Sequence, residues 1–275
     1  TLNPETRRSG GMHYTSIENI HKVIDPLFLD ELKKEFSDIC EIAVERTKER
    51  KLKEFQKKLA SLNFLDPACG SGNFLTETYL SLRRLENEVL RVLSHGQIAF
   101  GYADWNPIQV SLGQFYGIEI NDFAVTVAKT ALWIAESQMM KETEEIVLMH
   151  LKFLPLKSYT NIIEANALRI NWVDVVPKQK LNYIMGNPPF VGARLMKQGS
   201  IQKKEVQDIF GNIKDVQDLD YVTCWYKLAA QYIQNTNIQA CFVSTNSICQ
   251  GSQVPILWNV LFNDYHIPVS YTHLR

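Results

Sequence analysis

The residues with the clearest chemical potential are Asn187-Pro188-Pro189-Phe190, which follow the short apolar run Tyr183-Ile184-Met185. Two consecutive prolines fix their φ angles and remove two N–H donors, so the backbone here presents acceptors in a rigid array. The Asn187 side-chain oxygen and the Pro188 carbonyl could accept both hydrogens of an amino group. These two hydrogen bonds draw the nitrogen toward tetrahedral geometry and free its lone pair for attack. The pattern therefore predicts chemistry on an amino group.

Phe190 adds a flat aromatic face beside these acceptors. A nucleobase stacked on such a ring gains roughly 1–3 kcal/mol. The chemistry needs no strong general base, because the substituted amino group loses its proton easily. The competing interpretation is a rigid turn that ends in a core phenylalanine.

A second candidate site is the turn Asp66-Pro67-Ala68-Cys69-Gly70-Ser71-Gly72, which follows the apolar run Asn63-Phe64-Leu65. Gly70 and Gly72 allow a tight turn and let a ligand approach backbone N–H groups. The turn is not a G-x-G-x-x-G pattern and no lysine follows it, which disfavours a phosphate-binding loop. Asp66 could accept from a ligand ammonium group. The turn predicts a cofactor without phosphate at this contact, against the alternative of a plain glycine-rich turn.

Two further polar residues follow predicted strands. Glu119, in Gly117-Ile118-Glu119-Ile120, ends the second predicted strand, where an acidic residue can bind both hydroxyls of a ribose. Asn166, which precedes Ala167 and follows the third predicted strand, could offer its side-chain carbonyl to an adenine amino group. Each could instead be an ordinary solvent-facing or loop residue.

These segments need a scaffold that brings strand ends together. Short apolar runs predict strands over 63–65, 116–120, 161–164 and 181–185, and a buried strand over 239–244; helical patterns cover 73–93, 122–140 and 215–234. Strands that alternate with helices predict an α/β, doubly wound parallel sheet with right-handed crossovers. Residues 26–62 predict a helical N-terminal lead-in. Ligands of such a sheet bind at the carboxyl ends of its strands.

Composition excludes some classes of protein. The 275 residues are 45% hydrophobic and 21% charged, as in an ordinary globular protein. No apolar run approaches the roughly 20 residues of a membrane span, and the start of the chain has no signal-peptide pattern. Five scattered cysteines without a Cys-x-x-Cys pair predict no metal site and a reducing, cytoplasmic location.

The net charge of −1 requires that any surface for nucleic acid be local. One candidate is the polar segment 192–211, which carries Arg194, Lys197, Lys203 and Lys204 just after Phe190. We predict a mobile loop there that meets phosphates when DNA binds. The highly charged stretch 45–58 is interpreted instead as a solvated helix face. Glu31-Leu32-Lys33 and Glu49-Arg50-Lys51 match a nuclease Glu-x-Lys pattern, but they lie in helical text, so no nuclease is predicted.

In their order along the chain, Asp66–Gly72, Gly117–Ile120 and Asn187–Phe190 resemble motifs I, II and IV of amino-methylating DNA methyltransferases. Upstream, Arg8-Ser9-Gly10-Gly11-Met12-His13-Tyr14-Thr15 resembles motif X, and its place before motif I is the gamma-class order. The longer flanking text, from about residue 7 to about residue 268, is similar to the MmeI-like, type IIL group. In that group one long polypeptide carries nuclease, methyltransferase and target-recognition parts.

The resemblance implies transfer of a methyl group from S-adenosylmethionine to N6 of a flipped adenine in double-stranded DNA, within a restriction-modification system. It implies a Rossmann-like fold, with a helical lead-in over 1–61 that carries the motif X-like segment. A catalytic domain would cover 62–275 and stop before any target-recognition domain; a nuclease could belong to the same polypeptide. The implied catalytic residues are Asn187, Pro188, Pro189 and Phe190. The implied cofactor residues are Tyr14, Thr15, Asp66, Pro67, Ala68, Gly70, Gly72, Glu119, Ile120, Asn166 and Ala167, although position 166 often carries Asp in relatives.

Two other functions fit the same residues. Asn-Pro-Pro chemistry also serves methyltransferases that act on cytosine N4, on RNA or on protein glutamine. The chain could also be a catalytically silent module that binds cofactor or DNA within a larger assembly.

Overall fold

The computed structural model describes residues 15–94, 107–148, 150–151 and 161–267. The described residues form a five-stranded parallel sheet in the order β3-β2-β1-β4-β5. The strands are β1 (Phe64–Asp66), β2 (Phe115–Glu119), β3 (Asn161–Glu164), β4 (Tyr183–Gly186) and β5 (Gln239–Phe242). The predicted α/β doubly wound sheet is confirmed. The order of the strands reverses between β1 and β4, and this is where ligands of open α/β sheets bind.

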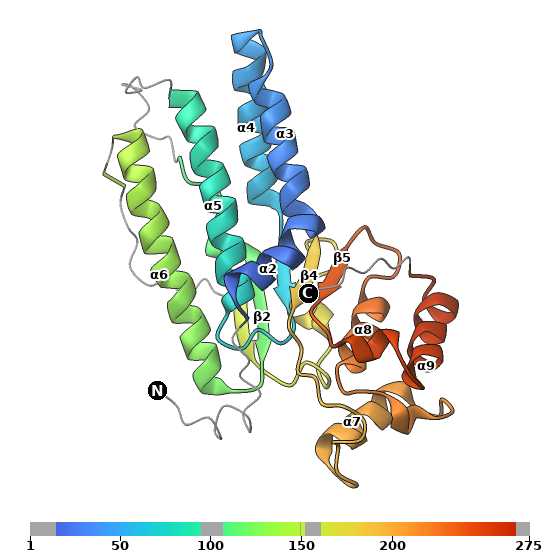
Figure 1. Ribbon diagram of the computed structural model, residues 1–275. Helices are drawn as coiled ribbons and strands as arrows, with labels where there is room; N and C mark the ends of the chain where they lie inside the picture. The colour runs from blue at the N-terminus through green and yellow to red at the C-terminus, as the bar shows by residue number, and fades with distance from the viewer. Residues whose placement is uncertain (1–14, 95–106, 149, 152–160, 268–275) are drawn as a thin grey trace.

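Helices cover both faces of the sheet (Figure 1). Helix α5 (Asn73–Ser94) connects β1 to β2, helix α6 (Asp122–Val147) leads from β2 toward β3, and the two stand side by side in one layer. Helices α8 (Thr223–Tyr232) and α9 (Gln253–Asn259) pack on the opposite side (Figure 1). Each layer has its own hydrophobic cluster, one built around Phe64, Phe115 and Leu132, the other around Leu65, Trp225 and Leu257.

The predicted helical lead-in is confirmed and consists of α2 (Ile17–Ile24), the π-helical turn η1 (Asp25–Leu29), α3 (Asp30–Cys40) and α4 (Glu45–Ser61). It packs against the sheet through Phe28, whose ring centroid lies 5.0 Å from those of Phe64 and Tyr183. The lead-in therefore shares the first hydrophobic cluster with β1 and α5. A domain boundary between residues 61 and 62 stays a prediction.

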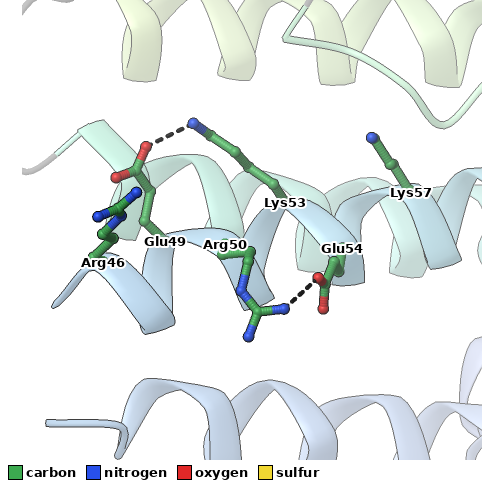
Figure 2. A pocket seen from close by; sticks show the side chains of 6 residues that line it. All are labelled: Arg46, Glu49, Arg50, Lys53, Glu54 and Lys57. Atoms are coloured by element: carbon green, nitrogen blue, oxygen red, sulfur yellow. Dashed lines mark hydrogen bonds and ion pairs between the residues drawn. The ribbon is translucent and has the colours of Figure 1, made fainter. Parts of the chain in front are cut away.

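The exposed side of α4 carries both signs of charge, as the sequence suggests (Figure 2). Lys53 pairs with Glu49 at 2.6 Å and Arg50 pairs with Glu54 at 2.8 Å. These are i,i+4 pairs with half-exposed side chains, which stabilise a helix by about 0.3–0.5 kcal/mol each. A shallow hollow of about 430 Å³ over this face is lined by these residues together with Arg46 and Lys57.

Two predicted elements in the C-terminal half are confirmed only in part. The predicted helix over 215–234 is split into the 3-10 turn η4 (Val216–Asp218) and α8, because the backbone of Leu219 is extended. The buried Asp220 side chain, which follows, accepts hydrogen bonds from Ala193 and Gln253. The predicted buried strand over 239–244 ends at Phe242. Its first two residues are exposed, because β5 forms the edge of the described sheet and lacks a neighbour on one side.

The segment 192–211, predicted to be a loop from its polar composition, is not a loop throughout. It contains α7 (Ile201–Phe210), whose start is capped by the Ser200 side chain, which accepts from the backbone N–H of Lys203. Val206 and Phe210 are buried in the second hydrophobic cluster. Val206 and Phe210, an apolar i,i+4 pair in a polar stretch of sequence, anchor the helix.

The remaining described elements are short: η2 (Leu112–Gln114), η3 (Trp172–Asp174), η5 (Asn246–Cys249) and the π-helical η6 (Val260–Asp264). Across the described residues, α5 and α6 have the length of a membrane span, but no helix combines that length with enough apolar character to cross a bilayer.

Candidate functional site

The turn after β1 is tied to the end of β2. The Asp66 carboxyl is buried, 1% exposed, and accepts from the backbone N–H of Ala68 at 3.0 Å. The N–H of Gly70 donates to Glu119 Oε2 at 2.9 Å, and the N–H of Cys69 donates to the Ile118 carbonyl at 3.1 Å. Three residues that the sequence proposed for one cofactor, Asp66, Gly70 and Glu119, thus lie together at the strand ends.

The two glycines of this turn, Gly70 and Gly72, have different structural roles. Gly70 has a φ of +53°, and a Cβ built on it would meet nothing within 4 Å, so its backbone is open to an approaching group. Gly72 has a φ of +81°, and a Cβ there would lie 2.9 Å from the Cβ of Ala128 on α6. Gly70 therefore leaves space for a ligand, while Gly72 lets the start of α5 pack closely against α6.

Glu119 retains acceptor capacity. Its Oε1 accepts from the backbone N–H of Asn121 at 3.0 Å, in addition to the bond from Gly70 to Oε2. A carboxylate offers about four acceptor positions, so two remain for a ligand. Beside it, the large apolar side chains of Ile120 and Phe123 are 67% and 63% exposed. This end of β2 combines acceptors for hydroxyl groups with an uncovered apolar surface, which suits a sugar that carries a flat heterocycle.

The Asp66 carboxyl has an altered acidity. Burial raises its pKa to about 8; the hydrogen bond from Ala68 opposes this and the negative charge of Glu119 adds to it. At neutral pH the carboxyl is therefore largely protonated until a cation lies next to it.

Asn187 follows β4, directly across the switch point from Asp66. A Cβ at Gly186 would overlap the Asp66 carboxyl, so the two strand ends are in contact. Asn187 Nδ2 donates to Thr15 Oγ1 at 2.9 Å, a contact across 172 residues of sequence, and Thr15 is 8% exposed. Asn187 Oδ1 is buried and has no hydrogen-bond partner in the described part of the chain.

The residues that follow Asn187 are Pro188, Pro189 and Phe190. Pro188 is buried, while Pro189 and Phe190 are half-buried, and Phe190 packs at the rim of the second hydrophobic cluster. Buried acceptors without partners are rare in folded proteins and demand an explanation. A substrate N–H donor is one that the chemistry of the motif provides.

Asn166 lies at the end of β3, within the same edge of the sheet. The neighbouring N–H of Ala165 donates to the Glu119 carbonyl at 2.8 Å. The amide of Asn166 is already engaged, because Oδ1 accepts from the N–H of Leu168 at 2.9 Å and Nδ2 donates to Glu205 at 2.7 Å. Ala167 is buried. The structure brings Asn166 to the site, and its contact with an adenine stays a prediction.

Of the predicted cofactor residues, Tyr14 lies outside the described residues, whereas Thr15, Asp66, Pro67, Ala68, Gly70, Gly72, Glu119, Ile120, Asn166 and Ala167 lie within them. The sequence had paired Thr15 with a cofactor, but the described contact of its hydroxyl is with Asn187. No group of three or more metal-binding side chains occurs among the residues that the structure describes.

Sequence reasoning missed two buried acids that support the site. Glu205 on α7 accepts from Asn166, from Arg169 Nε at 2.9 Å and from the Tyr221 hydroxyl. Asp220 accepts from the backbone N–H of Ala193 at 2.7 Å, and also from Ser247 and Gln253. Glu205 follows two lysines and Asp220 stands between Leu219 and Tyr221, and neither pattern distinguishes a buried acid from a solvated one.

A second hollow, of about 340 Å³, lies between α2, α3 and α5 and is lined in part by His21, Lys33 and Arg84. No strand-end residue lines this hollow or the one over α4. The site is therefore defined by its hydrogen bonds, its open backbone and its unpaired acceptor.

Comparison with known proteins gives three concordant matches. The family described as "MmeI, DNA-methyltransferase domain" matches residues 42–275. The chain is 43% identical over 272 residues to "DNA methyltransferase A" of Bacillus subtilis (strain 168), which covers 98% of this chain and 30% of that protein. It is also similar to the solved structure of the type IIL restriction-modification enzyme MmeI in complex with DNA, with a TM-score of 0.85 and 46% identity over 95% of this chain and 34% of that one.

A more distant match is a putative type II restriction enzyme and methyltransferase of Methanocaldococcus jannaschii, 28% identical over 165 residues, or 58% of this chain and 12% of that protein. The chain thus spans about a third of the length of the more similar relatives.

Proposed function

The chain belongs to the family of the MmeI DNA-methyltransferase domain, and from that premise we propose that it methylates the N6 amino group of an adenine flipped out of double-stranded DNA, with S-adenosylmethionine as the methyl donor. We propose further that it does so within a restriction-modification system. A nuclease and a target-recognition part would then belong to the two thirds of the relatives' length that this chain does not span.

One observation carries the proposal: Asn187 Oδ1 is a buried acceptor without a partner at a strand end. Leaving a buried acceptor unpaired costs about 1–3 kcal/mol. An amino group of the substrate would remove that cost by donating to Oδ1, and its second hydrogen would be accepted by the Pro188 carbonyl. The fixed φ of Pro188 and Pro189 holds the two acceptors in place before the substrate arrives.

These acceptors act on the reacting nitrogen. As both hydrogens are held out of the ring plane, the nitrogen pyramidalises and its lone pair turns toward the methyl donor. Hydrogen bonds that strengthen in this geometry lower the barrier more than they stabilise the bound substrate. Phe190 supplies a ring at the rim of the site on which the flipped base stacks, which offsets part of the few kcal/mol that flipping costs.

The residues at the ends of β1 and β2 fit S-adenosylmethionine. The open backbone at Gly70, the spare acceptors of Glu119 and the exposed side chain of Ile120 suit a ribose and an adenine ring. Bound there, the cofactor would supply an electrophilic methyl group on a sulfonium. Asp66 would accept from its ammonium group, while Pro67, Ala68 and Gly72 shape the turn. Asn166 and Ala167 would border the adenine, and Tyr14 keeps its implied cofactor role.

The full-length protein tests the proposal when it is given S-adenosylmethionine with an isotopically labelled methyl group and offered duplex DNA, RNA and protein in parallel. Mass spectrometry of the digested products should find the label as N6-methyladenine in DNA alone. Label in N4-methylcytosine, in RNA or in glutamine would replace the proposal with that alternative. Cofactor binding without transfer to any substrate would make the chain a silent module.

A further inference from the structure

The surface next to the catalytic motif carries an apolar tip between cations. Leu195 is 78% exposed, the largest exposed fraction among the large hydrophobic residues that the structure describes. Its neighbours Arg194 and Lys197 are exposed as well. Isolated exposed apolar residues are common and need no function. Leu195 differs because of how it is held and where it lies.

The turn that presents Leu195 is fixed at both ends. On its N-terminal side the Ala193 N–H donates to the buried Asp220 carboxylate at 2.7 Å, and on its C-terminal side Met196 is buried. The Leu195 N–H donates to the Gly192 carbonyl at 2.8 Å, which closes the turn. The side chain is therefore held outward on an anchored support, and not on a loop free to fold it back into the core.

The turn also faces the side from which a base must arrive. It begins two residues after Phe190 and leads into α7, which lies beyond the carboxyl ends of the strands, at the bottom of Figure 1. Over 191–211 the surface charge is mostly positive. This segment has four cations, Arg194, Lys197, Lys203 and Lys204, and two acids, Glu205 and Asp208, of which Glu205 is buried. Such a surface complements phosphates on both sides of an apolar tip.

We infer that the turn 192–197 enters the DNA beside the target adenine, with Leu195 inserted against the base stack and Arg194 and Lys197 on the flanking phosphates. Apolar side chains that wedge between base steps unstack them and are used by other DNA-binding proteins. Leu195 fills the space that the flipped adenine leaves, so it lowers the free energy of the flipped state. This inference rests on the proposed function and adds the residue that stabilises flipping.

The test compares Leu195→Ala with Leu148→Ala in the full-length protein. Leu148 is the matched control, because it is also a leucine, 65% exposed, and follows the far end of α6. Each variant is given a duplex that carries the site methylated by the wild-type protein, with 2-aminopurine at the target for flipping and adenine for methyl transfer. A second duplex leaves the target base without a pairing partner, which lowers the cost of flipping.

We expect Leu195→Ala to lose about tenfold or more in flipping and methyl transfer on the paired duplex and to recover on the unpaired one. Leu148→Ala should match the wild type on both. Wild-type flipping by Leu195→Ala would overturn the inference. So would an equal loss of flipping and methyl transfer on both duplexes together with a lower melting temperature of the variant protein, because Leu195 would then be covered by another part of the polypeptide. If the wild-type protein methylates no DNA, so that no such site exists, the proposed function fails and the inference with it.

Discussion

The contact between Thr15 and Asn187 gives the first residue-scale prediction. The Thr15 hydroxyl is the partner of Asn187 Nδ2, so it fixes which way the amide points. Thr15→Val keeps the shape of the side chain and removes that partner, and should lower the single-turnover methyl-transfer rate by about tenfold, the equivalent of a hydrogen bond of about 1.4 kcal/mol. Thr15→Ser keeps the hydroxyl and should restore most of the rate.

Cofactor affinity separates this positioning role from the cofactor role that the sequence suggested. Calorimetry should find that Thr15→Val binds S-adenosylmethionine as the wild type does. If cofactor affinity falls while the rate of the saturated enzyme is unchanged, Thr15 serves the cofactor and not Asn187.

Asp66 gives a prediction about stability and pH. Its pKa rises on folding from 3.8 to about 8, so the folded protein keeps a proton that the unfolded chain releases. Between these two values the unfolded state binds fewer protons, and stability therefore falls as pH rises, by up to about 1.4 kcal/mol per pH unit. Above about pH 8 this loss is complete.

Asp66→Asn removes the titration and keeps an acceptor for the Ala68 N–H. Without cofactor, the variant should melt at a higher temperature than the wild type at pH 7, and its melting temperature should fall less between pH 4 and 8. Its affinity for S-adenosylmethionine should be lower, because an amide cannot neutralise the ligand ammonium group. A wild-type pH profile in the variant would mean that Asp66 is ionised throughout.

At the scale of single residues, the places of Asp66, Glu119 and Asn187 at the strand ends could be predicted, because each stands at or just after the end of an apolar run. Their roles in binding and catalysis stay predictions. The hydrogen bond from Asn187 to Thr15 could not be predicted, because it depends on how the lead-in folds back across the sheet. Glu205 and Asp220 were missed for the same reason, since their burial is created by segments far away in sequence.

Helices α4, α5 and α6 are joined by a buried polar network, which gives an element-scale prediction. Arg83 and Glu86 form a fully buried ion pair on α5. Glu86 also accepts from Gln56 on α4, and Arg83 donates to Thr143 on α6. Glu86→Ala leaves the guanidinium buried without its counter-charge and should destabilise the protein by about 3–5 kcal/mol.

Glu88→Ala is the matched control for this pair. It removes the acid of the Arg91–Glu88 pair, which has the same i,i+3 spacing on the same helix but is half-exposed. Such a pair contributes about 0–1 kcal/mol. Urea unfolding of both variants should separate them clearly, and equal midpoints would show that the buried network does not hold the three helices together.

The elements with strong periodicity were predicted well, and those set by tertiary contacts were not. β3 and the start of α5 agree with their predicted bounds, because an apolar run or a glycine turn marks each one. α7 could not be predicted because its buried apolar residues, Val206 and Phe210, stand in a polar stretch of sequence. The edge position of β5 follows from sheet order, which no local pattern encodes.

At the scale of the whole molecule, two hydrophobic clusters on opposite faces hold a sheet whose switch point lies between β1 and β4. This topology explains why Asp66 and Asn187, 121 positions apart in the numbering, meet at one edge. It is also compatible with the proposed site, which has a cofactor side at β1 and β2 and a substrate side at β4. The proposed reaction takes place where the two sides meet.

The most direct test of this account is the single-turnover methyl-transfer rate of Asn187→Ala in the full-length protein, with cofactor and DNA saturating. Asn187 Oδ1 is the unpaired acceptor on which the mechanism rests. We expect transfer to fall by at least about a hundredfold, equivalent to about 2.7 kcal/mol or more in the barrier, with S-adenosylmethionine affinity near that of the wild type. Wild-type transfer by Asn187→Ala would contradict it.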